Sequence, residues 1–329
     1  MQFGLPWPGA EVAQEAEDAG VAAFCTGDFV DNDAYEVLAD MAQHSATAKV
    51  GTSIAYAFAR TPYAHAAALR TLHKKAPGRL FLGLGSGAYS INRDWFGVEA
   101  DRPVARMSDL AGAVRAWLRA ENGDRVTYEG PYYRVDAKVQ APVLGRLDVP
   151  LLFAGFNKGM VAAAAKHADG VIGHGLFTAR WWDEVVRPAA AGAGEEWLEH
   201  GWLITAIDDA DPARAVLEAR RMVGFYLTVK TYDGYVEHHG WTEEVARVRD
   251  AFAKRDMDGM ASAVSDEMLA AVAVCGTTAE AMAQFEKRAT EGSLARDLTY
   301  LAPPSFLTSD RRRAVYARNS LTLVREALG

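Results

Sequence analysis

The chain has 329 residues, half of them hydrophobic, which is enough for one large core or for two average domains. Its formal net charge of −8 argues against nucleic-acid binding, because such a partner requires a basic face that replaces phosphate counterions. The sequence has no polybasic segment, no run of about 18 apolar residues and no signal-peptide pattern, so we expect neither a membrane partner nor secretion.

Cysteine and histidine usage indicates neither a disulfide framework nor a metal site. Cys25 and Cys275 are the only cysteines. The pair His238-His239 has no acidic or cysteine neighbour at ligand spacing, and we interpret it as part of a solvated loop. We therefore expect no metal and a reducing, cytoplasmic compartment.

Short apolar segments of strand length alternate with amphipathic helical segments along the chain. The predicted strands are Gln2–Leu5, Val21–Cys25, Val50–Tyr56, Leu80–Leu84, Leu151–Ala154, Gly170–Ile172, Trp202–Ile207 and Leu298–Leu301. Regular alternation indicates a parallel sheet. Eight such units in a chain of this length favour a single (β/α)₈ TIM barrel over an open doubly wound sheet.

Helix-start signals support this alternation, and two segments interrupt it. Asp33 with Glu36, and Thr277 with Glu280, have the spacing of a capping box. Residues 122–148 look like an insertion with a small hairpin, and residues 230–265 look like a second insertion, late in the chain. We expect one domain over residues 1–329, with long loops of this kind shaping a substrate pocket.

The loops after the strands should carry the function, because the active sites of such barrels lie at the carboxyl ends of the strands. Glycines after the fourth, fifth and sixth strands would let a ligand approach the backbone closely. The helix start at residues 157–160 offers free amides and the charge of Lys158 to a phosphate. The aromatic residues that could cover a planar ring or a substrate are Trp7, Phe29, Tyr56 and Tyr89.

Each of these features also has a purely structural interpretation. Glycines after strands are common turn residues, and Lys158 can be a solvated surface lysine. Asp28 can cap the following turn. A lone histidine such as His174 is more often structural than functional.

The segment Gly83–Ala88 matches the GxGxxA dinucleotide fingerprint. That fingerprint requires a helix immediately afterwards, and residues 89–97 show no helical start. We expect the next helix only near Arg102. This favours a flexible loop at the end of the strand over a Rossmann crossover.

Several stretches, taken in order and spacing, resemble the bacterial-luciferase-like monooxygenase superfamily over nearly the whole chain. They are Val50–Ile54, Arg60–Pro62, Pro77–Gly87, Ala154–Met160, Ala168–Val171 and Cys275–Glu280. Members are (β/α)₈ barrels that use FMN or the deazaflavin coenzyme F-420. The resemblance therefore implies a flavin or deazaflavin oxidoreductase.

The resemblance also assigns positions around the cofactor. It implies a cis peptide between Ser53 and Ile54, at a bulge that backs the ring. It places Asp28 near the ring. The other cofactor-binding positions that it implies are Ala55, Gly85, Ser86, Gly87, Gly155, Phe156, Asn157, Lys158, Gly159 and Met160.

Two departures from the family concern proton transfer. Many members have histidine after the aspartate of the second strand, where this chain has Phe29, and many have glutamate in the loop near Asn92, where this chain has none. The catalytic residue is therefore unknown, with Asp28, His174 and Tyr56 as unranked candidates. Solvent or a substrate group can also supply the proton.

The opening Phe3-Gly4 and the late segment Ser265–Leu269 resemble the F-420 branch, which favours hydride transfer between F-420 and a small organic substrate. The alternatives are an FMN-dependent monooxygenase with a separate flavin reductase, and a catalytically inert flavin-binding barrel. The resemblance further implies a homodimer. Basic residues available for the acidic tail of F-420 are Arg60, Arg93, Lys158 and Arg180.

Overall fold

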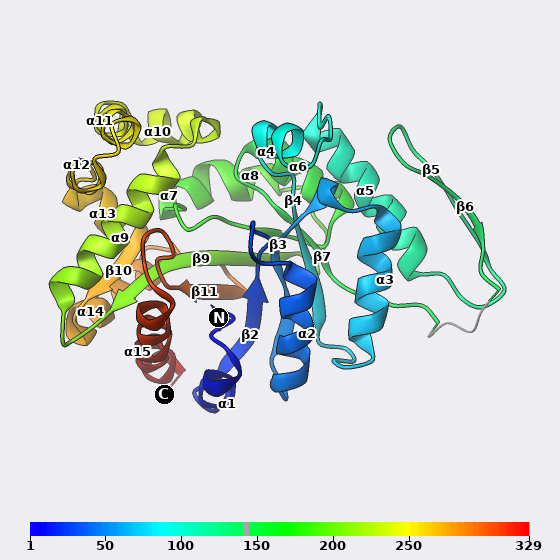
Figure 1. Cartoon of the computed structure of the whole chain (residues 1–329), viewed down its shortest axis with the longest axis horizontal. Coiled ribbons are helices and arrows are strands. Elements are labelled where there is room, and N and C mark those ends of the chain that lie inside the picture. Colours follow the sequence, from blue (N-terminus) through cyan, green and yellow to red (C-terminus); the bar gives the residue numbers. More distant parts are fainter. Residues whose placement is uncertain (141–144, 329) are drawn as a thin grey trace. The chain divides into compact units, whose positions relative to one another are not determined.

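The computed structural model describes residues 1–140 and 145–328. Its contacts divide the chain into two compact units. The first unit comprises Met1–Ala22, Gly173–Val185 and the chain from His200 onward, and the second comprises Ala23–Ile172 and Val186–Glu199. Figure 1 shows the elements of both, coloured along the chain from blue to red.

Parallel strands of the second unit pair in the order of the chain. They are β2 (Val21–Thr26), β3 (Lys49–Tyr56), β4 (Leu80–Gly85), β7 (Leu151–Ala154) and β8 (Gly170–Ile172). All residues of β4 and β8 are buried, as expected for parallel strands covered on both faces. The apolar runs in the sequence predicted these strands to within a residue.

In the first unit, β1 (Gln2–Pro6) pairs with β11 (Leu298–Ala302), and β11 pairs with β9 (Leu198–Ile207). An additional strand, β10 (Ala273–Gly276), also pairs with β9. The strand order, together with the pairing of β9 and β8, closes eight parallel strands into a (β/α)₈ barrel, as predicted.

Several helices begin where the sequence offers an N-cap. The Asp33 carboxylate accepts from the Tyr35 amide at 2.8 Å, and Thr277 with Glu280 forms the predicted capping box. The longer helices are α1 (Ala10–Asp18), α2 (Ala34–His44), α3 (Pro62–His73), α5 (Pro103–Leu118), α6 (Lys158–His167), α9 (Pro212–Leu227), α11 (Thr242–Ala253), α14 (Thr278–Thr290) and α15 (Asp310–Leu328). The shorter ones are α4 (Tyr89–Asp94), α7 (Ala179–Trp181), α8 (Arg187–Ala189), α10 (Asp233–His239), α12 (Met257–Ala263) and α13 (Asp266–Val272).

Three details differ from the sequence prediction. A helix does begin before Arg102, because α4 directly follows Ala88; Ala88 makes no side-chain cap, so the usual start signal is missing. The strand β10 was not predicted. The strand β9 begins at Leu198 rather than at Trp202.

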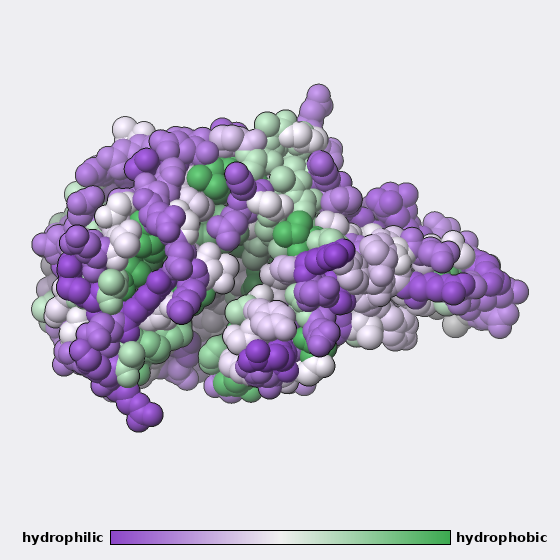
Figure 2. Space-filling model, turned by 90° about the horizontal axis from the view of Figure 1, so that it is seen from above, coloured by the Kyte–Doolittle hydropathy of each residue, from purple (hydrophilic) through white to green (hydrophobic). Residues whose placement is uncertain are grey.

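The two predicted interruptions have different structures. Residues 122–148 contain the expected hairpin, β5 (Arg125–Glu129) with β6 (Arg134–Lys138), and residues 141–144 of this segment lie outside the described residues. Residues 230–265 are mostly helical and include α10, α11 and α12. The hairpin extends beyond α5 in Figure 1, and its part of the surface in Figure 2 is mostly hydrophilic.

One buried carboxylate attaches the hairpin to α5. Asp109 is 4% exposed and accepts hydrogen bonds from the Tyr128 hydroxyl at 2.6 Å and from the amides of Tyr132 and Tyr133 at 2.7 and 2.8 Å. A side chain at Gly130 would overlap this carboxylate, since a Cβ there would lie 1.7 Å from Asp109 Oδ1. Asp109 thus makes the buried polar contacts between the hairpin and the helix.

A second buried polar contact joins α2 to α3. The Tyr35 hydroxyl lies 2.6 Å from His65 Nδ1, and His65 Nε2 lies 3.1 Å from the carbonyl oxygen of Ala57. A carbonyl can only accept, so Nε2 carries the proton and Nδ1 accepts from the tyrosine. Burial lowers the pKa of His65 to about 4, so the ring is neutral at pH 7.

Replacing Asp109 with alanine should lower the free energy of unfolding by about 3 kcal/mol, because three donors lose a charged, buried acceptor. Urea denaturation measures this change. Asp136→Ala is the control, since it removes an exposed ion pair with Arg125 on the same hairpin and should change little. Equal effects of the two substitutions would contradict the assigned role of Asp109.

Acid should destabilise the protein partly through His65. The unfolded chain protonates this histidine near pH 6.5 and the folded protein only near pH 4, so the unfolded state binds more protons between these values. The free energy of unfolding should therefore fall as the pH falls, with His65 contributing about 2 kcal/mol of loss at pH 5.

Urea denaturation at pH 7 and pH 5 of His65→Gln tests this contribution. The variant should lose about 2 kcal/mol less than the wild type over this step. His167→Gln, at an exposed histidine of α6, is the matched control and should not reproduce the effect of His65→Gln. A wild-type slope in His65→Gln would exclude a buried neutral His65.

Candidate functional site

The ends of β2, β3 and β4 meet around Ile54 in the second unit. The peptide bond between Ser53 and Ile54 is cis, as the resemblance implied, and the register of β3 against β4 shifts between Thr52 and Ala55. A Cβ at Gly85 would lie 2.6 Å from Ile54 Cδ1, so a larger residue there would have to displace the Ile54 side chain. We call Ser53–Tyr56, with Gly27 and Gly85 packed against Ile54, the Ile54 platform.

The backbone of this platform is held from the loop after β2. The amide of Asp28 donates to the carbonyl oxygen of Ile54 at 2.9 Å, and the Asp28 carboxylate accepts from the amide of Tyr56 at 2.7 Å. The same carboxylate accepts from the amide of Ala34, at the start of α2, at 2.8 Å. Asp28 therefore connects the ends of β2 and β3 to the first turn of α2.

Arg60 completes the surroundings of Asp28. Its guanidinium donates two hydrogen bonds to the Asp28 carboxylate, at 2.6 and 3.0 Å, and a third to Asp33 at 2.7 Å. Burial lowers the pKa of Arg60, but the hydrogen bonds and charges of the two aspartates outweigh it and raise the pKa above its ordinary value. The guanidinium also lies over the Tyr35 ring, 5.0 Å from its centroid.

The basic residues expected to face an acidic tail are thus mostly engaged elsewhere. Arg60 is paired with Asp28 and Asp33, Arg93 with Asp94, and Arg180 with Glu184. The fourth, Lys158, is exposed at the start of α6.

The helix α4, which follows β4, contains a buried hydrogen-bond acceptor that no donor among the described residues satisfies. Asn92 is 2% exposed, and its Nδ2 donates to the carbonyl oxygens of Ser86 and Ala88 at 2.8 and 3.0 Å. These two bonds fix the orientation of the amide. Asn92 Oδ1 has no hydrogen-bond partner within the described residues. A buried acceptor of this kind is costly unless a ligand or water donates to it.

The loop between β4 and α4 turns close to the platform. Gly87 has a positive φ of 67°, and a Cβ there would lie 3.3 Å from the Tyr56 ring and 3.4 Å from Asn92 Nδ2. Gly87 therefore lies beside Tyr56.

Exposed aromatic side chains surround these loops. Phe29 and Tyr89, both predicted substrate residues, are 60% and 57% exposed. Trp95 is 49% exposed and packs edge-on against Phe29, with the ring centroids 6.0 Å apart. Tyr56 is half-buried and packs against Phe96 at 5.2 Å. Large apolar rings that remain exposed together are typical of a binding surface.

The predicted phosphate site lies at the start of α6. Asn157, Lys158 and Gly159 are exposed, whereas Gly155 and Met160 are buried. Asn157 is the N-cap, but its side chain caps no amide among the described residues, so the first turn keeps donors for an anion. Gly155 is required by packing, because a Cβ there would lie 2.7 Å from Val171 and 2.9 Å from Val161.

Two predicted residues belong to the first unit. Trp7 is half-buried after β1. His174 packs against Tyr226, with centroids 4.3 Å apart, and its Nε2 lies 3.4 Å from the Tyr232 hydroxyl. Burial lowers the pKa of His174 to about 3, so the ring is neutral at pH 7. In this state it can accept a proton but cannot act as a cationic acid.

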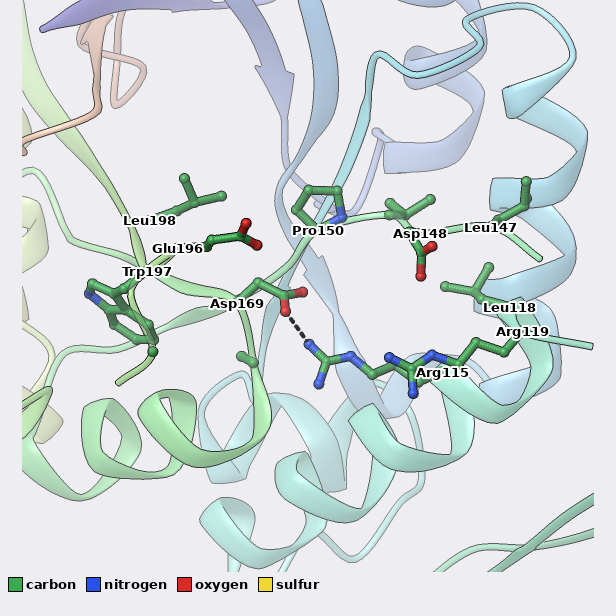
Figure 3. A pocket seen from close by; sticks show the side chains of 13 residues that line it. Arg115, Leu118, Arg119, Leu147, Asp148, Pro150, Asp169, Glu196, Trp197 and Leu198 are labelled. Atoms are coloured by element: carbon green, nitrogen blue, oxygen red, sulfur yellow. Dashed lines mark ion pairs between the residues drawn. The ribbon is translucent and has the colours of Figure 1, made fainter. Parts of the chain in front are cut away.

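A separate cavity of about 620 Å³ lies at the opposite ends of the strands in the second unit. Pro150, Asp169 and Trp197, which precede β7, β8 and β9, line it together with Arg115 of α5 (Figure 3). Arg115 forms a 2.7 Å ion pair with Asp169 across it. Its walls carry charges of both signs and none of the predicted site residues.

The described residues contain neither a cluster of metal ligands nor a membrane-spanning helix. No group of three or more histidine, cysteine, aspartate or glutamate side chains there could hold a metal ion. No helix within residues 1–140 or 145–328 is both long and apolar enough to cross a membrane.

Four features of the site were missed in the sequence. Asn92, Trp95 and Phe96 carry no motif of their own, and only their i, i+3, i+4 spacing, which starts in α4 and continues past its end, could have grouped them. The pairing of Arg60 with Asp28 spans 32 positions and gives no local pattern.

Comparison with known proteins gives concordant results. The F-420-dependent glucose-6-phosphate dehydrogenase of Kineococcus radiotolerans is 29% identical, over 67% of this chain and 70% of that protein. Among solved structures, the F-420-dependent tetrahydromethanopterin reductase of Methanopyrus kandleri superposes with a TM-score of 0.78 at 21% identity, covering 97% of both chains.

An FMN complex has the same fold. The oxygenating constituent of 3,6-diketocamphane monooxygenase from Pseudomonas putida, a type II Baeyer–Villiger enzyme, superposes with a TM-score of 0.65 at 15% identity, over 99% of this chain and 98% of that one. The family model for luciferase-like monooxygenases matches residues 8–294. The chain therefore belongs to the luciferase-like monooxygenase family.

Proposed function

We propose that this protein is an oxidoreductase that binds coenzyme F-420 and transfers a hydride between it and a small organic substrate. The observation that carries the proposal is the unused acceptor of Asn92, buried in α4 after the loop that lies beside Tyr56 of the Ile54 platform. A deazaflavin ring has an N–H that can donate to such an acceptor. The residues present therefore fit the ring.

The proposed contacts of the cofactor all come from the second unit. Ile54 and Ala55, next to Ser53, would support the ring from one side, with Gly85, Ser86 and Gly87 along its edge. The turn from Gly155 to Met160, with the exposed Lys158, would hold the phosphate through backbone donors. When bound, the deazaflavin supplies a carbon that accepts or gives a hydride, because carbon replaces the reactive ring nitrogen of a flavin.

The aromatic side chains would hold the substrate. Phe29 with Trp95, and Tyr56 with Phe96, form two ring pairs beside the platform, and Tyr89 is exposed nearby in sequence. Trp7 of the first unit is a further proposed substrate contact. These rings favour a substrate with apolar surface, which they would shield from water during hydride transfer.

The two positions at which many relatives carry a proton-transfer residue hold no acid or base in this chain. They are Phe29 and the neighbourhood of Asn92, and each oxygen of the Asp28 carboxylate already accepts two hydrogen bonds. Burial raises the pKa of Tyr56, which keeps its phenol protonated at pH 7. We propose that the proton is exchanged with solvent or with a group of the substrate, because the low pKa of His174 makes its neutral ring a weak base.

Two observations favour F-420 over FMN. Phe3-Gly4 and Ser265–Leu269 resemble the F-420 branch, and the chain is similar to the F-420-dependent dehydrogenase of Kineococcus radiotolerans. The similarity to the FMN complex of the 3,6-diketocamphane monooxygenase constituent favours the second candidate. This candidate is a monooxygenase that receives reduced flavin from a separate reductase. A binding experiment distinguishes the two, and turnover distinguishes both from an inert flavin-binding barrel.

Titration of the purified chain with F-420 and with FMN, followed by fluorescence, tests the proposal. We expect F-420 to bind at least tenfold more tightly than FMN. Asn92→Ala should weaken F-420 binding about tenfold, because the ring loses one hydrogen bond to a buried acceptor. Ser90→Ala, at an exposed position of α4, is the matched control.

Two outcomes would overturn the proposal. Tight binding of FMN alone would assign the chain to the flavin-dependent members. Binding of F-420 without hydride transfer to any of a panel of alcohols, aldehydes, imines and enones would favour the inert barrel.

The homodimer is a separate part of the proposal and rests on the resemblance to the family. Light scattering on the eluting protein should give twice the chain mass of 35.6 kDa. A value equal to the chain mass would exclude a stable dimer.

A further inference from the structure

We propose that Asp28 and Arg60 are a positioning pair that fixes the backbone of the Ile54 platform, and that neither residue acts on the substrate or holds the acidic tail of the cofactor. This inference rests on the proposed function and changes the roles that the sequence suggested for both residues. It concerns how this chain builds its cofactor site with the usual proton-transfer residues missing.

The hydrogen bonds of Asp28 all serve the backbone or Arg60. Oδ2 accepts from the Tyr56 amide at 2.7 Å and from Arg60 at 2.6 Å, and Oδ1 accepts from the Ala34 amide at 2.8 Å and from Arg60 at 3.0 Å. A carboxylate has about four acceptor directions, so this one is saturated. Its side chain is 7% exposed, which leaves little room for a ligand atom.

Three hydrogen bonds hold the backbone of the platform and of the residue that follows it. Asp28 holds the carbonyl oxygen of Ile54 and the amide of Tyr56, and His65 donates to the carbonyl oxygen of Ala57 at 3.1 Å. Two of these three contacts belong to Asp28. The end of β3 is therefore fixed by side chains and loops from outside the strand.

The positive charge of Arg60 compensates the charge of the Asp28 carboxylate. A buried carboxylate without a partner would be costly, and the bidentate guanidinium compensates its charge. The guanidinium is itself held by Asp33 at the start of α2 and by the ring of Tyr35, whose hydroxyl donates to His65. The connection runs from the platform through Asp28 and Arg60 to α2, and through Tyr35 to α3.

The geometry argues against the two alternative roles. An acid or base needs a lone pair or a proton within reach of the substrate, whereas every oxygen of Asp28 is engaged. An anchor for the cofactor tail needs an unpaired cation, whereas Arg60 already donates to both aspartates and its side chain is only 19% exposed.

Three variants of the full chain test the proposal. Asp28→Asn keeps the shape but loses the charge, Arg60→Lys keeps the charge but loses the bidentate contact, and Arg60→Met loses both. The control is Arg106→Met, because Arg106 also pairs with an aspartate, Asp101 at 2.7 Å, and also lies over a tyrosine ring, Tyr132 at 4.3 Å, but away from the platform.

The first readout needs no cofactor. Hydrogen exchange of the Tyr56 amide should be at least tenfold faster in Asp28→Asn and Arg60→Met than in the wild type, while Arg106→Met keeps the wild-type rate. Urea denaturation of each variant shows whether the change is local. Protection of Tyr56 that is unchanged in a folded Asp28→Asn would overturn the proposal, whatever the protein binds.

The second readout separates positioning from anchoring. Fluorescence titration compares F-420 with the same deazaflavin lacking its glutamate tail. A displaced platform should weaken both about equally, by about 10- to 100-fold in Arg60→Met and in Arg60→Lys, because small misplacements cost this much. A loss confined to the tailed form would make Arg60 an anchor instead.

The third readout separates positioning from catalysis. If the variants turn over F-420, their pH profiles should keep the wild-type limbs, with the loss mainly in cofactor affinity. Loss of one limb in Asp28→Asn at unchanged affinity would make Asp28 an acid or base. If the wild type binds neither F-420 nor FMN, the proposed function fails, and the exchange of the Tyr56 amide still decides the positioning role.

Discussion

Parallel pairing is the constraint on which the rest of the molecule depends. Because every strand of the barrel runs in the same direction, the loops after β2, β3 and β4 emerge at one edge, although they lie far apart in sequence. The platform around Ile54 is made by this convergence. Glycines at positions 27 and 85 let the three loops approach, and polar groups that leave the strands must find partners there.

Those partners include a few charged and aromatic side chains that are mostly buried. Asp28 satisfies two backbone amides at once, and the cost of burying its charge is offset by Arg60. Asp109 likewise satisfies two backbone amides at once, those of Tyr132 and Tyr133, and also accepts from the Tyr128 hydroxyl. By contrast, Asn92 keeps an acceptor that the protein does not satisfy. All acceptor positions of the Asp28 carboxylate are used by the protein, as is typical of a structural polar group. The unused acceptor of Asn92 is instead available to a ligand.

Much of the fold could be predicted from the sequence, because buried parallel strands appear as continuous apolar runs. All eight barrel strands and the hairpin were expected, although β9 starts earlier and β10 was missed. Hydrophobic periodicity did not predict α4, because this helix is short and lacks a side-chain cap. The hydrogen bonds of Asn92 to Ser86 and Ala88 hold it instead. It also could not show that Arg60 is committed to Asp28, since ion pairs between distant segments have no spacing rule. The positions expected around the cofactor do lie on strand ends, while their roles stay proposals.

The contact between Gly85 and Ile54 links the variation of two positions. A methyl group at position 85 would lie 2.6 Å from the Ile54 side chain, so the space is shared between strands β3 and β4. A homologue with a side chain at position 85 must therefore accommodate it with a smaller or differently shaped residue at position 54. Across an alignment of such proteins, the two columns should co-vary in side-chain volume.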